Sequence, residues 1–359
     1  MEVLVVGEGL WPWYEEACHE GFLENGHSSH LVTWADRFWA ENSTSGLKSR
    51  RSKISGFQDR LKLGPILQDI NELILRQVAI KRPDVVFFHN CRHVFPSTVQ
   101  KLRAEKSRPL LVHYTNDNPF SRKASYGRWR LLRKGVEFYD EHFVYRPANL
   151  DDFTQAGAKS VHVLPPYWFP RMSQNFRAER SAGEFTWDVA FGGHYEADGR
   201  REVLEALAKS GLRVKVTGGG WQPVLEGTSS PLLEFGPVEP SIGHEYNALI
   251  GLSKISLCFF SSLNEDVYTR RNFEIPAMGG AMLSQHSDEL TGFFAPEDEA
   301  VYFKTLEEIP NKVQALLSSE SAREAMAAQA TERLHLDRHT NKDRMARVLE
   351  EINVTHLAD

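Results

Sequence analysis

The first half of the chain alternates short apolar runs with helical patterns. Apolar runs predict strands at 2–6, 29–34, 85–88, 110–114, 143–145 and 161–164. Apolar residues three and four apart predict helices at 14–24 and 66–80. Strands that are apolar throughout are typical of a sheet covered on both faces, and strand–helix–strand units of this kind require parallel strands. The polar stretch 36–60 interrupts the pattern and is predicted to be an irregular insertion.

The second half repeats this alternation. Strands are predicted at 187–191, 212–217, 254–260 and 281–284, with helices at 200–210, 245–252 and from 306 onward. The stiff, proline-rich stretch 164–170 predicts a linker between the halves. We therefore expect an α/β protein with two Rossmann-like parallel-sheet domains, at 1–168 and 169–338, facing a cleft.

Parallel sheets bind ligands beyond the carboxyl ends of their strands. In this chain that rule selects residues 7–9, 89–90, 115–119, 192–194, 218–220 and 261–274. The last of these segments contains the most informative chemistry.

Residues 261–274 place charged side chains at a strand end, just before a short helix. Asp266, Arg270 and Arg271 lie in the loop, Asn272 is predicted to cap the helix, and Glu274 falls in its first turn. An ionised carboxylate accepts two hydrogen bonds from a vicinal diol such as ribose, and adjacent arginines with open amides suit a diphosphate. The pattern indicates a nucleotide-sugar pocket. A solvated surface ion network is the alternative.

Glycine turns follow three predicted strands, where a phosphate can approach the backbone closely. Ordinary turn glycines are the alternative at each. The turn at Gly7 and Gly9 lacks the third glycine of a dinucleotide-binding fingerprint, which argues against NAD binding. The candidate residues are Gly192 and Gly193 followed by His194, Gly218 and Gly219, and Gly7 and Gly9.

The sequence HYTNDNPF at 113–120 ends another predicted strand with hydrogen-bonding groups. Asp117 is a candidate general base for an acceptor hydroxyl, or could orient it, and His113 and His89 are further candidates. A turn built by the Asn and Asp side chains is the alternative. No histidine pair has metal-binding spacing and the three cysteines are scattered, so neither a metal nor a disulfide is predicted.

Composition narrows the class of protein. The net charge of −6 argues against non-specific nucleic-acid binding. No apolar run reaches the roughly 18 residues of a transmembrane helix, and the amino terminus resembles a strand more than a signal peptide. We therefore expect a cytoplasmic protein. The basic segment 128–134, which interleaves Trp129, Leu131 and Leu132, is a candidate for peripheral contact with the inner face of the membrane.

Several blocks together resemble a known family. They are DVAFGG at 188–193, VKVTGGGW at 214–221, YNALIGLSKISLCFF at 246–260, RRNFEIPAMGGAML at 270–283 and SDELTGFF at 287–294. The chain resembles the spore-maturation (CgeB-like) branch of the GT-B glycosyltransferases, which is related to the group-1 family. HYTNDNPF is similar to the aspartate-proline loop of that family.

The resemblance implies a donor nucleotide sugar on the second domain, an acceptor on the first, and a last helix at 339–359 crossing back to the first domain. Glu274 matches the glutamate that holds the donor ribose, with Asn272 and Phe273 beside it in the block. Asp266 stands where many group-1 members carry the first glutamate of an acid-x7-Glu pair, so the aspartate is a departure.

The resulting hypothesis is a metal-independent glycosyltransferase of polysaccharide biosynthesis. It would use no cofactor beyond the nucleoside-diphosphate sugar, and Arg270 or Arg271 would offset the charge on the leaving diphosphate. Two alternatives remain: a nucleotide-sugar epimerase or hydrolase on the same fold, and a non-catalytic binding or coat-assembly protein.

Overall fold

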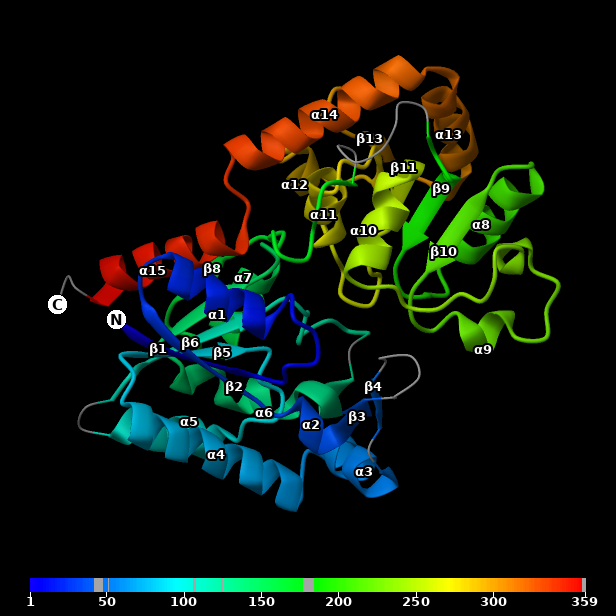
Figure 1. Ribbon diagram of the computed structural model, residues 1–359. Helices are drawn as coiled ribbons and strands as arrows, with labels where there is room; N and C mark the ends of the chain where they lie inside the picture. The colour runs from blue at the N-terminus through cyan, green and yellow to red at the C-terminus, as the bar shows by residue number, and fades with distance from the viewer. Residues whose placement is uncertain (42–47, 51, 106–107, 124, 177–183, 357–359) are drawn as a thin grey trace. The chain divides into compact units, whose positions relative to one another are not determined.

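Figure 1 presents the computed structural model, which describes residues 1–41, 48–50, 52–105, 108–123, 125–176 and 184–356. The chain divides into two compact units. Unit 1 comprises Met1–Pro165 with Asn341–Asp359, and unit 2 comprises Pro166–Thr340. Along the described residues, none of the helices combines the length and apolar character that crossing a membrane requires.

Unit 1 contains a 6-stranded sheet in the order β2-β1-β5-β6-β7-β8, with every neighbouring pair parallel. Its strands are β1 (Glu2–Gly7), β2 (Ser28–Thr33), β5 (Val85–His89), β6 (Leu110–Thr115), β7 (Glu141–Val144) and β8 (Val161–Val163). Each strand predicted in this half is present. The central strand β5 is buried at every residue, as its unbroken apolar run predicts.

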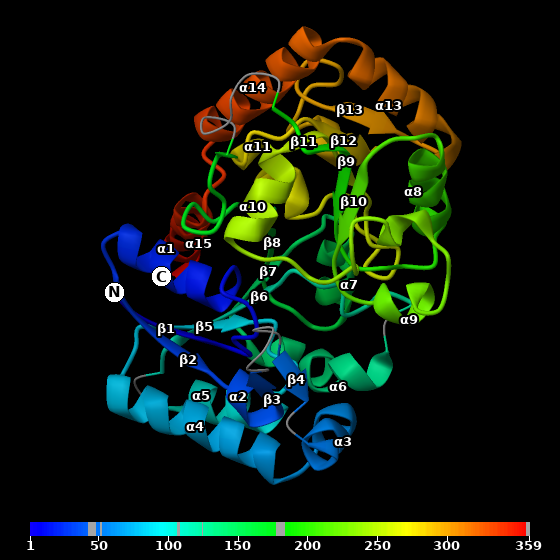
Figure 2. The same cartoon turned by 45° about the vertical axis from the view of Figure 1, so that its right-hand side comes forward.

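Helices cover both faces of this sheet. Figures 1 and 2 show α1 and α15 on one face and α4 and α5 on the other. On the second face, Leu67 and Ile70 of α4 and Val99 and Leu102 of α5 contribute to one apolar cluster. The helices of unit 1 outside the insertion are α1 (Glu15–Glu24), α4 (Pro65–Lys81), α5 (Pro96–Ala104), α6 (Tyr126–Gly135), α7 (Asn149–Gln155) and α15 (Asn341–His356).

The prediction of an irregular insertion at 36–60 is wrong for its described part. This part forms two helices, α2 (Ala35–Phe38) and α3 (Lys53–Leu61). Between them, β3 (Trp39–Glu41) and β4 (Lys48–Arg50) pair as antiparallel strands. Residues 42–47 and 51 lie outside the described residues. The side chains of Ser52 and Ser55 each accept a hydrogen bond from the other's backbone amide, at 3.0 and 3.1 Å. This capping box starts α3 in a polar stretch that has no conventional apolar face.

The helix α15 completes unit 1, although it follows unit 2 in the sequence. It packs along α1, where Gly21 provides the close approach. Asn341 Nδ2 donates to the carbonyl of Ala17 at 2.9 Å, and Arg344 Nε donates to the carbonyl of Pro165 at 3.0 Å. The expected return of the last helix to the first domain is confirmed.

Unit 2 contains a 5-stranded parallel sheet in the order β10-β9-β11-β12-β13. Its strands are β9 (Trp187–Gly192), β10 (Val214–Thr217), β11 (Ser253–Cys258), β12 (Met282–Gln285) and β13 (Val301–Phe303). Its helices are α8 (Arg200–Lys209), α9 (Gln222–Leu225), α10 (His244–Gly251), α11 (Arg271–Ala277), α12 (Asp288–Thr291), α13 (Ile309–Ser318) and α14 (Glu320–Leu336). One apolar cluster joins the sheet to α8, α13 and α14.

The basic helix α6 differs from the expected membrane contact. Trp129, Leu131 and Leu132, the apolar residues of segment 128–134, are all buried in the core of unit 1. The apolar face of α6 is therefore occupied within the protein.

Four buried histidines lie in the described part of unit 1: His89, His93, His113 and His142. Burial lowers the pKa of His93 and of His142 to about 4 in each case. Burial, and secondarily the neighbouring His142, lowers the pKa of His113 well below its usual value. His142 Nε2 donates to the carbonyl of Val136 at 2.9 Å, so its Nδ1 accepts from His113 Nδ1 at 3.1 Å. This arrangement requires the ring of His142 to be neutral, because its Nδ1 accepts.

We expect Gly21→Ala to lower the free energy of unfolding by about 2 kcal/mol, the scale of overpacking a tight core. An added Cβ would lie 2.7 Å from Met345 Cγ and 2.8 Å from the Asn341 carbonyl oxygen. Urea unfolding measures the change. Gly56→Ala, also in a helix but with no atom within 4 Å of its added Cβ, is the control. Equal stability of the two variants would contradict the tight α1–α15 packing.

We expect unit 1 to lose stability as the pH falls from neutrality toward the folded-state values near 4 of His93 and His142. The unfolded chain binds protons on these rings from about pH 6.5 downward, whereas the folded chain does not. The loss is about 1 kcal/mol per histidine between about pH 7 and about pH 5.5. Urea unfolding at both pH values tests this, and His142→Gln should reduce the dependence. An unchanged free energy of unfolding would exclude buried neutral rings.

Candidate functional site

Two guanidinium groups hold the chain where β11 ends. Arg271 Nη2 donates to the carbonyl of Phe259 at 3.2 Å. Arg200 Nη2 donates to the carbonyl of Phe260 at 3.1 Å, and its Nη1 donates to the carbonyl of His194 at 2.7 Å. Arg200 is 1% exposed. Arg200 Nε also donates to Asp198 Oδ1 at 2.8 Å, so its charge is paired while its other nitrogens fix the strand end.

The helix α11 begins two residues earlier than the Asn272 cap predicts. Arg270 occupies the N-cap position and Asn272 lies inside the helix. Asn272 Oδ1 accepts from the Thr269 amide at 2.7 Å, and its Nδ2 donates to Ser284 Oγ at 2.8 Å. Asn272 therefore ties the turn before α11 to strand β12, and its full burial prevents contact with a donor.

Three buried polar atoms near the start of α11 have no hydrogen-bond partner among the described residues. They are Glu274 Oε2, the Tyr246 hydroxyl and Arg271 Nε. Glu274 Oε1 lies 3.2 Å from Arg270 Nη1, so one carboxylate oxygen is paired and the other is not. Buried polar atoms are rarely left unsatisfied, and each one costs free energy unless a ligand or water completes it.

Electrostatic interactions link these groups. Burial, and then the negative charge of Glu274, raise the pKa of Tyr246 above its usual value. Burial, and then the positive charge of Arg271, lower the pKa of His194. At neutral pH the site therefore presents a neutral phenol and a neutral imidazole beside a carboxylate and two guanidinium groups.

The glycine turns after β9 and β10 are hydrogen-bonded to each other through their main chains. The Gly193 amide donates to Thr217 O at 2.8 Å, and the Tyr195 amide donates to Gly219 O at 2.9 Å. Gly218 has φ +140 and contacts the carbonyl of Gly193 so closely that no side chain fits. After the β9 turn, α8 starts only at Arg200, whereas after the β10 turn the short helix α9 starts at Gln222.

The other glycines of these turns make room for site residues. An added Cβ on Gly193 would lie 2.9 Å from Arg271 Nη1, and one on Gly219 would lie 3.0 Å from His194 Nε2. Gly192 borders the ring of Tyr246. The structure therefore brings Gly192, Gly193, His194 and Gly219 close to residues of the charged turn.

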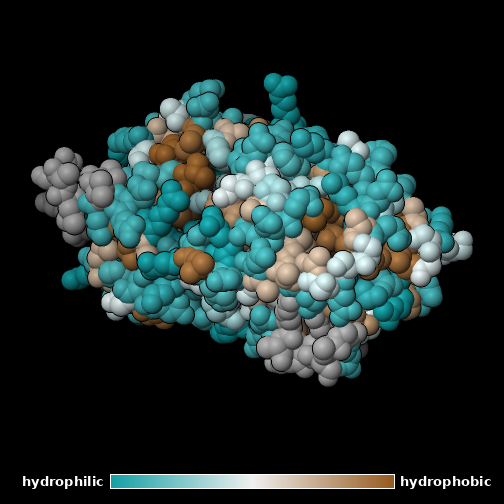
Figure 3. All heavy atoms as spheres, turned by 90° about the horizontal axis from the view of Figure 1, so that it is seen from above, coloured by the Kyte–Doolittle hydropathy of each residue, from teal (hydrophilic) through white to brown (hydrophobic). Residues whose placement is uncertain are grey.

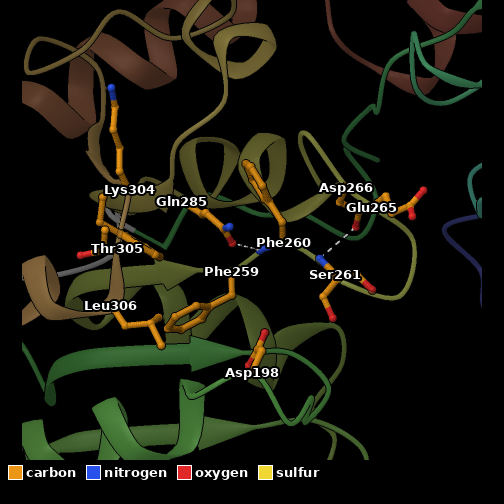
Figure 4. Close-up of a pocket in the computed structure, with 12 residues that line it drawn as sticks. Asp198, Phe259, Phe260, Ser261, Glu265, Asp266, Gln285, Lys304, Thr305 and Leu306 are labelled. Atoms are coloured by element: carbon orange, nitrogen blue, oxygen red, sulfur yellow. Dashed lines mark hydrogen bonds between the residues drawn. The ribbon is translucent and has the colours of Figure 1, made fainter. Parts of the chain in front are cut away.

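A cavity of about 280 Å³ lies at the carboxyl ends of β11, β12 and β13. Figure 4 shows Phe259 and Phe260 in its wall, with the Phe260 amide donating to Gln285 Oε1 at 3.0 Å. Asp266 also lines it and accepts from the Ser261 amide at 3.3 Å. The cavity adjoins the carbonyls that Arg271 and Arg200 hold, but Glu274 is not among its lining residues.

Phe273 is fully buried and packs edge-to-face on Phe293, Phe294 and His339. The expectation that Phe273 contacts the donor is therefore corrected, because its ring belongs to the core of unit 2.

In unit 1, Asp117 lies at the carboxyl end of β6. Its Oδ2 accepts from Asn90 Nδ2 at 3.4 Å and lies 3.7 Å from Arg128 Nη2. The alternative turn also forms, since Asn118 Oδ1 accepts from the Phe120 amide at 3.0 Å. Asp117 itself remains part-exposed.

The remaining candidates of unit 1 are buried or used in packing. His113 is 0% exposed and packs among aromatic rings, so it does not reach an acceptor. Gly7 adjoins the buried side chain of Glu15, and Gly9 adjoins Thr33. Within the described part of the chain, no three His, Cys, Asp or Glu side chains group as metal ligands.

Sequence reasoning missed Tyr246 and Arg200. Tyr246 lies in the first turn of α10, where an aromatic residue normally indicates packing. Arg200 is the first residue of α8 and follows Gly199. A basic residue directly after a glycine at a helix start was the sequence feature that could have identified it as a candidate site residue.

Known proteins share this architecture. The family described as "Glycosyl transferase-like" matches residues 200–350. Sucrose-phosphate synthase from Thermosynechococcus elongatus is similar at 12% identity with a TM-score of 0.70, covering 100% of both chains. Trehalose 6-phosphate synthase from Burkholderia multivorans is similar at 13% identity with a TM-score of 0.63, covering 99% of both chains.

Anabaena HepE, solved in complex with UDP and glucose, is similar at 11% identity with a TM-score of 0.66. The comparison covers 99% of this chain and 100% of HepE. No curated protein sequence matches. The two parallel sheets, the returning helix and these similarities establish that the chain has the GT-B glycosyltransferase fold.

We expect Asn272→Ala to lower the free energy of unfolding by about 2 kcal/mol, because it removes the buried hydrogen bonds of Asn272 to the Thr269 amide and to the Ser284 hydroxyl. Thermal unfolding measures the loss. Ser284→Ala removes only one of these bonds and should cost about half as much. If Asn272→Ala is as stable as the wild type, the asparagine does not hold the turn before α11.

Proposed function

We propose that the protein is a glycosyltransferase of the spore-maturation branch that moves a sugar from a nucleoside diphosphate to a hydroxyl acceptor. The acceptor is a glycan, a lipid-linked saccharide or another hydroxyl compound. The single observation that carries the proposal is the group of buried, unsatisfied polar atoms on Glu274, Tyr246 and Arg271.

The donor site lies on unit 2. Glu274 Oε2 is free to accept from a ribose hydroxyl, while Arg270 holds the other carboxylate oxygen in place. A carboxylate fixed in this way binds a diol with charge-assisted hydrogen bonds. The UDP in the HepE complex supports a nucleotide on a GT-B fold of this kind.

Arg270 and Arg271 stabilise the leaving diphosphate. Negative charge grows on the diphosphate as the glycosidic bond breaks, and preorganised positive charge lowers the barrier most when it is already in place. Arg271 is preorganised by its bond to the Phe259 carbonyl. These two guanidinium groups supply the charge that a metal provides in other transferases, so we propose a metal-independent reaction.

The acceptor side lies on unit 1. Asp117 is part-exposed, and Asn90 and Arg128 orient its carboxylate. We propose that it orients the acceptor hydroxyl or receives its proton. His113 is left out because it is fully buried.

An epimerase or hydrolase would consume the donor without an acceptor, and a non-catalytic protein would consume none. A donor-only assay separates the three functions. Transfer requires loss of the sugar nucleotide to depend on an added acceptor.

We expect Glu274→Ala to weaken nucleoside-diphosphate-sugar binding by about tenfold or more, since a charged hydrogen bond is lost. A thermal-shift screen with UDP, GDP and their sugars identifies the donor in the wild type, because a ligand of the folded state raises its melting temperature. Titration of the donor then compares the variants. Glu289→Ala, at an exposed glutamate of α12, is the matched control. Full donor affinity and turnover in Glu274→Ala would refute the proposal.

A further inference from the structure

The helix α3 has its polar and apolar sides exchanged relative to an ordinary surface helix. Its apolar residues Ile54, Phe57 and Leu61 are 71%, 62% and 43% exposed. Its buried residues are the polar Ser55 and Asp59. Positions three and four apart share one helix face, so the apolar stripe points outward and the polar stripe points into unit 1.

A buried polar network prevents the helix from turning its apolar side inward. Asp59 Oδ1 lies 2.5 Å from Lys62 Nζ and 2.7 Å from His93 Nε2. Trp34 Nε1 donates to His93 Nδ1 at 3.1 Å, which places the imidazole proton on Nε2, facing Asp59. Separating buried, paired charges is costly, so the network fixes the orientation of α3.

The outward stripe is extended by a neighbouring residue. Leu63, just after α3, is 55% exposed. Figure 3, which draws one face of the molecule, shows hydrophobic residues in small separate patches among hydrophilic ones. Away from α3 and α6, the exposed large apolar residues of the described chain come singly from separate segments: Met1, Leu23, Ile80, Ile242, Leu263 and Leu336.

Positive charge flanks the stripe on α3 itself and on α6. Lys53 and Arg60 are exposed on α3, and the only acidic residue between positions 48 and 64 is the buried Asp59. The neighbouring helix α6 packs on α3, and Arg130 Nη2 donates to the carbonyl of Leu61 at 2.9 Å. Positions 121–136 are basic at several places and contain no acidic residue. This basic region is unexpected in a chain whose net charge is −6.

We propose that these residues, Ile54, Phe57, Leu61 and Leu63 with Lys53, Arg60 and Arg130, form an α3 surface that docks on an anionic lipid bilayer. An apolar helix face flanked by Lys and Arg inserts at the boundary between headgroups and acyl chains, and its cations attract anionic lipids. A protein partner or second copy would account for the apolar stripe, but the one-sided charge favours an anionic membrane.

The α3 surface replaces segment 128–134 as the apolar contact. The apolar residues of that segment are in the core, and its cations contribute only to the charge around α3. The proposal does not depend on transferase chemistry, so it is tested without any sugar nucleotide.

The test is cosedimentation of the full chain with phosphatidylcholine vesicles, with and without phosphatidylglycerol. We expect binding only to the anionic vesicles, and weaker binding at high salt because salt screens exposed charges. The double variant Ile54→Ser with Phe57→Ser should bind about tenfold more weakly or worse, since two exposed apolar side chains no longer enter the bilayer. The control double variant Ile80→Ser with Leu336→Ser changes equally exposed residues elsewhere and should bind as the wild type does.

Charge and depth are measured separately. Lys53→Gln with Arg60→Gln should weaken binding several-fold, whereas Arg76→Gln with Lys81→Gln on α4 should not. An environment-sensitive fluorophore attached to Phe57→Cys should shift to the blue on anionic vesicles, whereas the same label at Ile80→Cys should not. The three native cysteines are all buried, so labelling is directed to the introduced thiol.

Three results would overturn the proposal. The first is no binding of the wild type to anionic vesicles. The second is binding that the α3 variants leave unchanged although circular dichroism shows all variants folded. The third is a dimer in solution that Phe57→Ser dissociates in the absence of vesicle binding, which would assign the α3 surface to a second copy of the chain.

Discussion

The end of β11 depends on two buried guanidinium groups that bind main-chain carbonyls. The last carbonyls of a parallel strand lack ladder partners, and burying them without a donor is costly. Arg271 and Arg200 supply these donors at Phe259 and Phe260. The loop that carries Asp266, the start of α11 and the wall of the cavity all follow from where this strand end is held.

Buried polar atoms beside this strand end lower the stability of the protein when no ligand is bound. Glu274, Tyr246 and Arg271 keep polar atoms buried with no partner among the described residues, which costs free energy that a ligand recovers. Sites of this kind are usually less stable than the same fold with satisfied or apolar side chains. The burial of these atoms differs from the solvated surface ion network that was the alternative interpretation of the charge pattern.

Much of the fold was predictable because parallel strands buried on both faces have unbroken apolar sequences, such as residues 85–88. The charged turn was predictable from the density of its side chains. Roles that depend on distant partners were not: Asn272 resembles a helix cap, but its partner Ser284 lies on the next strand. Likewise the polar segment at 36–60 forms α3 because Asp59 meets His93, far along the chain.

The site residue Tyr246 was missed for a related reason. An aromatic residue in a helix normally predicts packing in the core. Only the structure shows that the ring of Tyr246 borders Gly192 and that the charge of Glu274 acts on its hydroxyl. The membrane contact predicted for the apolar residues of segment 128–134 was wrong for a different reason. Alternation of apolar and basic residues does not show whether the apolar side chains are already buried in the protein core.

The return of α15 to unit 1 has a consequence for biosynthesis. Unit 2 is one continuous stretch, bounded by segments that run side by side where the Trp168 amide donates to the His339 carbonyl at 3.1 Å. Unit 1 needs Asn341 and the residues after it to cover α1. A ribosome makes the amino-terminal part first, and domains generally fold in that order. Here unit 1 begins first but is completed only after unit 2 has been made, so the face of α1 that α15 covers stays exposed, and open to chaperones, throughout the synthesis of unit 2.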